Sequence, residues 1–101
     1  MKKYKLRYLP SFRDELADVI QYLKYDLCNP EAAESLLNSV NEAVNCRLFM
    51  PFAAEAVHTN KEHVVYYRIY VKNYTIYYTV IDDVMEIRRF VYSRRNIKDI
   101  L

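Results

Sequence analysis

The sequence of 101 residues contains no glycine and no tryptophan, and it has only three prolines and two cysteines. Without glycine, tight turns must rely on asparagine and aspartate, which tolerate the left-handed backbone conformation. Cys28 and Cys46 form no CxxC pair and have no histidine at metal-ligand spacing, so we expect reduced thiols, no metal and no cofactor. A secretory signal and a membrane-spanning run are also missing, which favours a cytoplasmic location.

A chain of this length fits one domain, residues 1–101, with a single core and little room for an enclosed active site. The net charge of +2 identifies no partner, but the stretch 88–98 has no acid and contains Arg88, Arg89, Arg94, Arg95 and Lys98. Such a run is either a solvated strand edge and tail or a contact for an anionic partner. The eleven tyrosines suit interfaces, base stacking and sheet packing, because each combines a flat apolar ring with a polar tip.

The first part of the chain predicts a strand followed by a helix. Residues 4–9 alternate between apolar and basic side chains, which is the period of a half-buried strand, and Pro10 ends that strand. Apolar residues then recur at steps of three and four through residues 12–27, as in an amphipathic helix. Ser11 stands at the expected N-cap of this helix.

A second helix is predicted over residues 30–48. Asn29 is a good N-cap, and Pro30 at the first helical position loses no useful hydrogen bond. Pro51 stops the helix. Because the connection between the two helices is so short, we expect them to form an antiparallel hairpin.

Residues 51–63 have no clear period and are expected to form a loop, with at most a short extra helix. From Val64 onward the sequence predicts three antiparallel strands joined by turns at Lys72-Asn73 and Asp82-Asp83. Two-residue turns place these residues opposite one another: Val65 and Val80, Tyr67 and Tyr78, Ile69 and Ile76, Val71 and Tyr74, Tyr78 and Ile87, and Tyr74 and Val91. This face is apolar except for Arg89, and it should pack on the helices.

The opposite face of the three strands is polar and aromatic. We expect it to carry Tyr66, Arg68, Tyr70, Thr75, Tyr77, Thr79, Glu86, Arg88, Phe90 and Tyr92. A slip of one residue would bury Arg68 and Arg88 without partners, which is too costly. An open face of this kind either binds a polyanion, with arginines on phosphates and rings on bases, or is simply a solvated sheet stabilised by cross-strand pairs.

Several segments, taken together and in order, resemble the RelE/ParE toxins of bacterial type II toxin–antitoxin modules. They are Asn29-Pro30-Glu31-Ala32-Ala33 with Leu36-Leu37, the stretch from Tyr67 to Tyr78, and Ile87 to Val91 followed by Tyr92-Ser93-Arg94-Arg95-Asn96. The resemblance covers nearly the whole chain. It implies an α+β fold in which an N-terminal strand and an antiparallel helical hairpin combine with a three-strand antiparallel meander, in a single mixed four-strand sheet.

The resemblance implies a toxin with a cognate antitoxin as its partner and no membrane contact. The first reading is a RelE-like mRNA interferase, a metal-independent endoribonuclease that acts on mRNA at the ribosome. The alternatives are a ParE-like inhibitor of DNA gyrase and a degenerate member that only binds an antitoxin.

Site residues follow from the resemblance by position. Arg68 is the candidate for stabilising phosphate charge, together with Arg88. Tyr92 stands where many members have a histidine that serves as acid or base, and a tyrosine with a pKa near ~10 can donate a proton but is a poor base. Tyr70 and Tyr77 on the polar face are candidate RNA- or target-binding residues, and Arg94 and Arg95 would bind either the RNA backbone or the antitoxin. Lys61 and His63 are further binding candidates as basic residues of the preceding loop, although they match no specific residue of the family; the alternative for them is a solvated loop.

Overall fold

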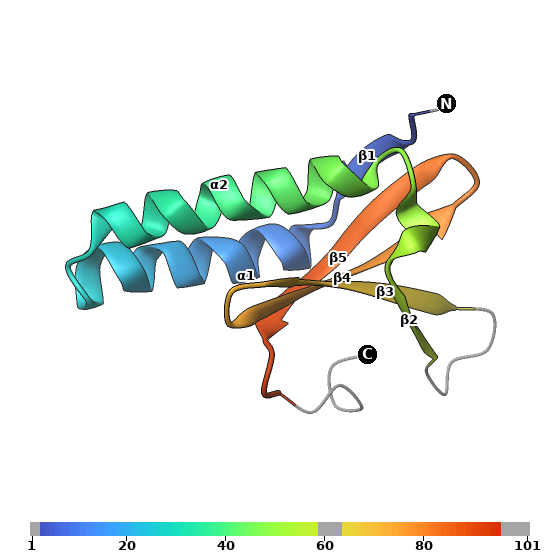
Figure 1. Ribbon diagram of the computed structural model, residues 1–101. Coiled ribbons are helices and arrows are strands. Elements are labelled where there is room, and N and C mark those ends of the chain that lie inside the picture. The colour runs from blue at the N-terminus through green and yellow to red at the C-terminus, as the bar shows by residue number, and fades with distance from the viewer. Residues whose placement is uncertain (1–2, 59–63, 96–101) are drawn as a thin grey trace.

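The computed structural model describes residues 3–58 and 64–95. Two helices, α1 (Pro10–Gln21) and α2 (Pro30–Arg47), accompany a five-strand sheet. The strands are β1 (Lys5–Tyr8), β2 (Glu55–His58), β3 (Val65–Val71), β4 (Tyr74–Ile81) and β5 (Val84–Tyr92). Their order in the sheet is β1-β5-β4-β3-β2, with β1 parallel to β5 and every other pair antiparallel (Figure 1).

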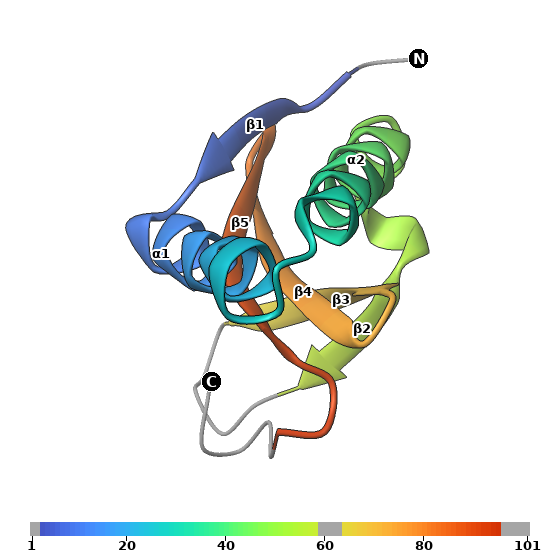
Figure 2. The same ribbon diagram turned by 90° about the vertical axis from the view of Figure 1, so that its left-hand side faces the viewer.

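The expected α+β arrangement is confirmed, with an N-terminal strand, a helical hairpin and a three-strand meander. α1 and α2 run in opposite directions and lie side by side, as Figure 2 shows nearly end-on. The sheet has five strands among the described residues rather than the expected four, because β2 joins its far edge. No helix in the described part of the chain is long and apolar enough to cross a membrane.

α1 begins earlier than its apolar period suggested. Pro10 occupies the first helical turn, where its missing N–H is no loss, and Leu9 is the N-cap. The expected cap, Ser11, instead donates its hydroxyl hydrogen to the carbonyl oxygen of Arg88 at 2.7 Å. Pro10 therefore starts the helix as well as ending the strand.

The connection between the helices departs from regular α-helix. A π-helical turn, η1 (Tyr22–Asp26), continues α1, and Cys28 then takes a left-handed conformation with φ 49°. The cap of α2 is as predicted, since the side-chain oxygen of Asn29 accepts a hydrogen bond from the backbone N–H of Ala32 at 3.1 Å.

The two predicted hairpin turns are confirmed. The first residue of each turn, Lys72 and Asp82, has φ 55°, a conformation that glycine usually provides. Both ladders follow the expected register next to the turns, with pairs Val71–Tyr74, Ile69–Ile76, Tyr67–Tyr78, Ile81–Val84 and Tyr78–Ile87. The β3–β4 ladder ends at Tyr67–Tyr78, so the expected pair of Val65 with Val80 is not part of it.

β5 has one residue more than β4 in the middle of their ladder. Tyr77 pairs with Arg89, whereas its neighbour Tyr78 pairs with Ile87. Arg88 is therefore the extra residue of a β-bulge. Beyond the bulge every pairing is shifted by one position relative to our expectation.

This shift corrects the predicted faces at the end of β5. Tyr92, rather than Val91, lies opposite Tyr74. Phe90, expected on the polar face, is 2 % exposed in the main core, and Val91 packs with Tyr77 on the other side. The extra residue reverses the alternation, so Phe90 and Tyr92 lie on the helix side of the sheet.

β2 lies within the segment that we expected to be a loop. It pairs with β3 through Glu55–Arg68 and His58–Val65. The sequence of β2, Glu-Ala-Val-His, has little β propensity because it contains one β-branched residue. The segment forms a strand because it pairs with the edge of β3, which is a tertiary contact rather than a local preference.

The main core lies between the helices and the sheet. Its buried members are Phe12, Leu36, Val40, Val44, Leu48, Ile69, Val71, Ile76, Tyr78, Met85, Ile87 and Phe90. Tyr78 is completely buried, and its hydroxyl donates to the carbonyl oxygen of Pro51. This burial raises the pKa of Tyr78 to about 12.

α1 also covers the part of β5 that β1 leaves unpaired. The pairing of β1 with β5 ends at Ile87. In the following residues of β5, the Glu15 carboxylate on α1 accepts two hydrogen bonds from Arg89, from Nε at 2.9 Å and from Nη2 at 2.7 Å. It also accepts one from the backbone N–H of Phe90 at 3.1 Å. Arg89, the one charge that we expected on the apolar face, thus has a carboxylate partner on α1.

Candidate functional site

Arg68 lies on the outer face of β3, next to β2. Its guanidinium donates from Nη2 to Glu55 Oε1, and the Tyr70 hydroxyl donates to Glu55 Oε2 at 3.3 Å. The guanidinium carbon also lies 5.6 Å from the centroid of the Tyr70 ring. The hydrogen bond between Arg68 and Glu55 lowers the pKa of Glu55 and raises that of Arg68. The phosphate-binding candidate is therefore already paired with a carboxylate.

Glu55 is the member of this cluster that the sequence did not predict. It reaches Arg68 because the two residues are directly opposite in the β2–β3 ladder. A strand over residues 55–58 was not expected, so the sequence pattern contained no signal for this pair.

Arg88, the residue of the bulge, belongs to a second charged cluster. Glu86, with a side chain only 10 % exposed, lies between Arg7 Nη1 at 3.2 Å and Arg88 Nε at 3.7 Å. The Arg88 guanidinium also lies over the Tyr66 ring, 5.5 Å from its centroid. Two cations share one carboxylate, so the cluster carries a surplus positive charge.

Much of the outer face is buried rather than open. Tyr77 is 4 % exposed and Tyr66 5 %, and they form a second small core with Val91. Burial raises the pKa of Tyr77. Thr75 and Thr79, which we expected on the polar face, are also buried. Tyr77 therefore has no free ring face for a base, whereas Tyr70 is 59 % exposed.

Tyr92 is separated from the two arginine clusters by the sheet. Its ring packs edge-on against Tyr74, with the ring centroids 5.5 Å apart. Our expectation that Tyr92 shares a face with Arg68 and Arg88 was wrong, because the bulge turns Tyr92 to the helix side. Arg94 and Arg95 follow in a turn and are exposed.

Two predicted binding residues, Lys61 and His63, lie outside the described residues. Among the residues that the structure does describe, no three His, Cys, Asp or Glu side chains gather as metal ligands.

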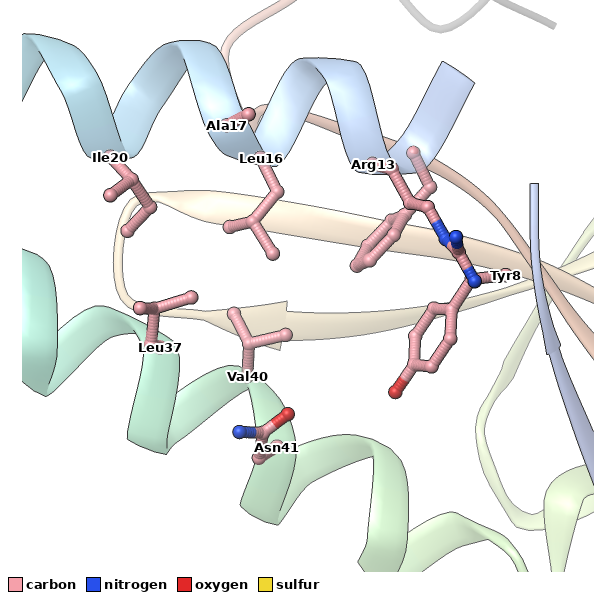
Figure 3. A pocket seen from close by; sticks show the side chains of 9 residues that line it. Tyr8, Arg13, Leu16, Ala17, Ile20, Leu37, Val40 and Asn41 are labelled. Carbon is pink, nitrogen blue, oxygen red and sulfur yellow. The ribbon is translucent and has the colours of Figure 1, made fainter. Parts of the chain in front are cut away.

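An apolar groove runs between the two helices. Figure 3 shows Leu16 and Ile20 of α1 facing Leu37 and Val40 of α2 across it, with Arg13 near one end. Its volume is about 380 Å³. Leu37 is 36 % exposed, which is high for a leucine on the apolar stripe of a helix. The helical hairpin therefore leaves part of its apolar surface uncovered.

Residues 6–97 match the family model described as the ParE toxin of a type II toxin–antitoxin system, parDE. One similar solved structure is the chromosomal ParDE system from P. aeruginosa, with 13 % sequence identity, a TM-score of 0.72, and coverage of 89 % of this chain and 96 % of that one. Another is an archaeal RelE–RelB complex from Pyrococcus horikoshii OT3, with 14 % sequence identity and a TM-score of 0.61; the match covers 94 % of this chain and 100 % of that one. No curated protein sequence matches the chain significantly. At these identities the structures establish the fold, and the family model spans nearly the whole sequence. The chain therefore belongs to the ParE toxin family of type II toxin–antitoxin systems.

Proposed function

We propose that this chain is the toxin of a two-component module, held inactive by a cognate antitoxin, and that it acts by binding DNA gyrase rather than by cutting RNA. The observation that carries this proposal is the separation of the candidate catalytic groups. Arg68 is paired with Glu55 on the outer face, and Tyr92 lies on the helix side of the sheet.

Cleavage of RNA without a metal needs a cation at the phosphate and an acid or base at the reacting oxygens, all on one side of the substrate. An RNA phosphate would have to displace Glu55 from Arg68. Tyr92 could not reach the same phosphate from across the sheet, and Tyr77 is too buried to stack on a base. Inhibition by binding needs none of these arrangements.

An mRNA interferase is the second candidate, and one observation favours it. Arg88 belongs to a cluster with a surplus positive charge on the same outer face as Arg68. In this alternative Arg68 and Arg88 stabilise the phosphate, and Tyr92, the proton donor expected from the sequence, would first have to move from the helix side of the sheet. The RNA contacts are then Tyr70, Tyr77, Arg94, Arg95, Lys61 and His63.

The groove between α1 and α2 is the proposed docking site of the antitoxin. An apolar groove between two helices suits the apolar face of an amphipathic helix or an extended segment. The groove offers Leu16, Ile20 and Leu37 as apolar contacts above the buried Val40, and Arg13 at its rim suits an acidic side chain.

A paired assay tests the proposed activity. The purified chain is added to gyrase with supercoiled DNA, and separately to ribosomes programmed with a defined message. We expect stabilised DNA cleavage complexes and an intact message. Cuts at the ribosomal A site that disappear with Arg68→Ala, together with unaffected gyrase, would contradict the proposal and favour the interferase.

A further inference from the structure

Three tyrosines gather where β4 begins and β5 ends. Tyr74 and Tyr92 are opposite one another beyond the bulge, with ring centroids 5.5 Å apart in an edge-to-face contact. The inner face of Tyr74 stacks on buried Phe90 at 4.9 Å. Tyr22 stands at the start of η1. The pKa of Tyr74 is raised by burial first, and then by its neighbours Tyr92 and Tyr22. Tyr22 is 50 % exposed and Tyr92 42 %. We call Tyr22, Tyr74 and Tyr92 the terminal tyrosine patch.

The chain beside the patch is held in place by three hydrogen bonds. The backbone N–H of Ser93 donates to the carbonyl oxygen of Asn73 at 2.9 Å, and the hydroxyls of Ser93 and Thr75 are 2.8 Å apart. The N–H of Arg95 donates to the carbonyl oxygen of Tyr92 at 3.0 Å, which closes a turn. A surface ordered in this way loses little conformational entropy when a partner binds.

Charge around the patch is divided between its two sides. On the strand side, Arg94 and Arg95 are exposed, and residues 70–81 and 87–95 contain no aspartate or glutamate. On the helix side, Asp18 and Asp26 lie four residues before and after Tyr22. A complementary surface therefore has an apolar centre, with carboxylates on the side that meets the two arginines.

Tyrosine and arginine are the residue types that dominate binding energy at protein interfaces. Single-stranded nucleic acid instead needs successive free ring faces on which bases stack. In the patch, one face of Tyr74 is covered by Phe90 and the ring of Tyr92 meets Tyr74 edge-on. These contacts favour a protein partner over a nucleic acid.

We infer that the terminal tyrosine patch, flanked by Arg94 and Arg95, is the surface with which this toxin contacts its protein target. The inference rests on the proposed function, because it assumes inhibition by binding. None of the three tyrosines lines the groove proposed for the antitoxin. Target and antitoxin would thus be recognised by different residues.

The test compares variants of the full chain. Tyr92→Ala, Tyr22→Ala and the double charge reversal Arg94→Glu/Arg95→Glu alter the patch. Tyr25→Ala is the matched control, because Tyr25 is a tyrosine of the same η1 turn and is 72 % exposed. Each variant is induced in cells to measure growth arrest, and each purified protein is titrated against gyrase supercoiling. Thermal unfolding identifies any variant that fails to fold.

We expect the concentration that halves supercoiling to rise at least tenfold for the patch variants and less than twofold for Tyr25→Ala. Growth arrest should weaken in the same order. Folded patch variants as potent as the wild type would overturn the inference, even when gyrase is the target. If the wild-type chain arrests growth without affecting gyrase and leaves the message on programmed ribosomes intact, only the assignment of gyrase fails, and loss of arrest in the patch variants supports the patch. Arrest that is accompanied by cuts in the message would overturn the inference together with the proposed function. Tyr92-dependent binding of a single-stranded oligonucleotide, or a wild-type chain with neither effect, would overturn it.

Discussion

Replacing Glu15 by alanine removes three hydrogen bonds that join α1 to the edge of β5. The carboxylate accepts from both sides of the Arg89 guanidinium and from the backbone N–H of Phe90. After the substitution Arg89 loses this carboxylate, and the N–H of Phe90 loses its acceptor. We therefore expect a large loss of stability from a single exchange on the helix surface.

The magnitude follows from the burial of the pair. Breaking a fully buried ion pair costs about 3–5 kcal/mol, mostly because the remaining charge is left without compensation. The side chains of Arg89 and Glu15 are 26 % and 21 % exposed, so water compensates part of that cost. A value of about 2–3 kcal/mol in the free energy of unfolding is therefore expected for Glu15→Ala.

Urea unfolding followed by circular dichroism measures this change. Glu34→Ala on α2 is the matched control, because Glu34 is exposed and its replacement should change stability by about 0.5 kcal/mol or less. The double variant with Arg89→Ala should lose clearly less than the sum of the two single losses. A loss for Glu15→Ala no larger than that of the control would refute the reasoning.

Three further predictions follow from single positions. Burial raises the pKa of Tyr78 to about 12, so the unfolded chain releases this proton first. The contribution of Tyr78 to stability should therefore be constant below about pH 10 and fall by up to about 2–3 kcal/mol toward pH 12. Alkaline urea titrations check this, and Tyr78→Phe should have a shallower slope. Cys28→Gly should be more stable than Cys28→Ala by about 1 kcal/mol, because only glycine accepts φ 49° without strain; equal unfolding midpoints would contradict this. Leu37→Asp should weaken binding of the cognate antitoxin at least tenfold in calorimetry, whereas Asn38→Asp on the same helix should not.

The sequence predicted the hairpins of the meander because local chemistry determines them. A two-residue turn leaves only one register next to it. Asp82 takes the left-handed conformation as the sequence chemistry suggested, but in the first turn Lys72 takes it rather than Asn73. The cap of α2 at Asn29 was predictable for the same reason, since it depends on neighbours within one turn. The start of α1 at Pro10 could also have been inferred, because proline favours the first helical position.

The remaining errors concern features that depend on distant contacts. Two adjacent arginines, Arg88 and Arg89, interrupt the alternation of β5, and this was the one visible signal of the bulge. The sequence could not show that Glu15, more than seventy residues away, would bind Arg89 next to the bulge. Likewise β2 exists only because β3 offers it an edge, so the pair of Glu55 with Arg68 was invisible in the pattern.

The parallel pairing of β1 with β5 also has a kinetic consequence. It brings together Arg7 and Glu86, which are separated by 79 positions in the chain. The length-dependent part of closing such a loop costs about 4 kcal/mol of chain entropy, whereas the hairpins of the meander close over two residues each. We therefore expect the meander and the helices to form early and β1 to dock late in folding. By the same reasoning β1 is the first strand to detach, so its amides should exchange hydrogen faster than those of β4.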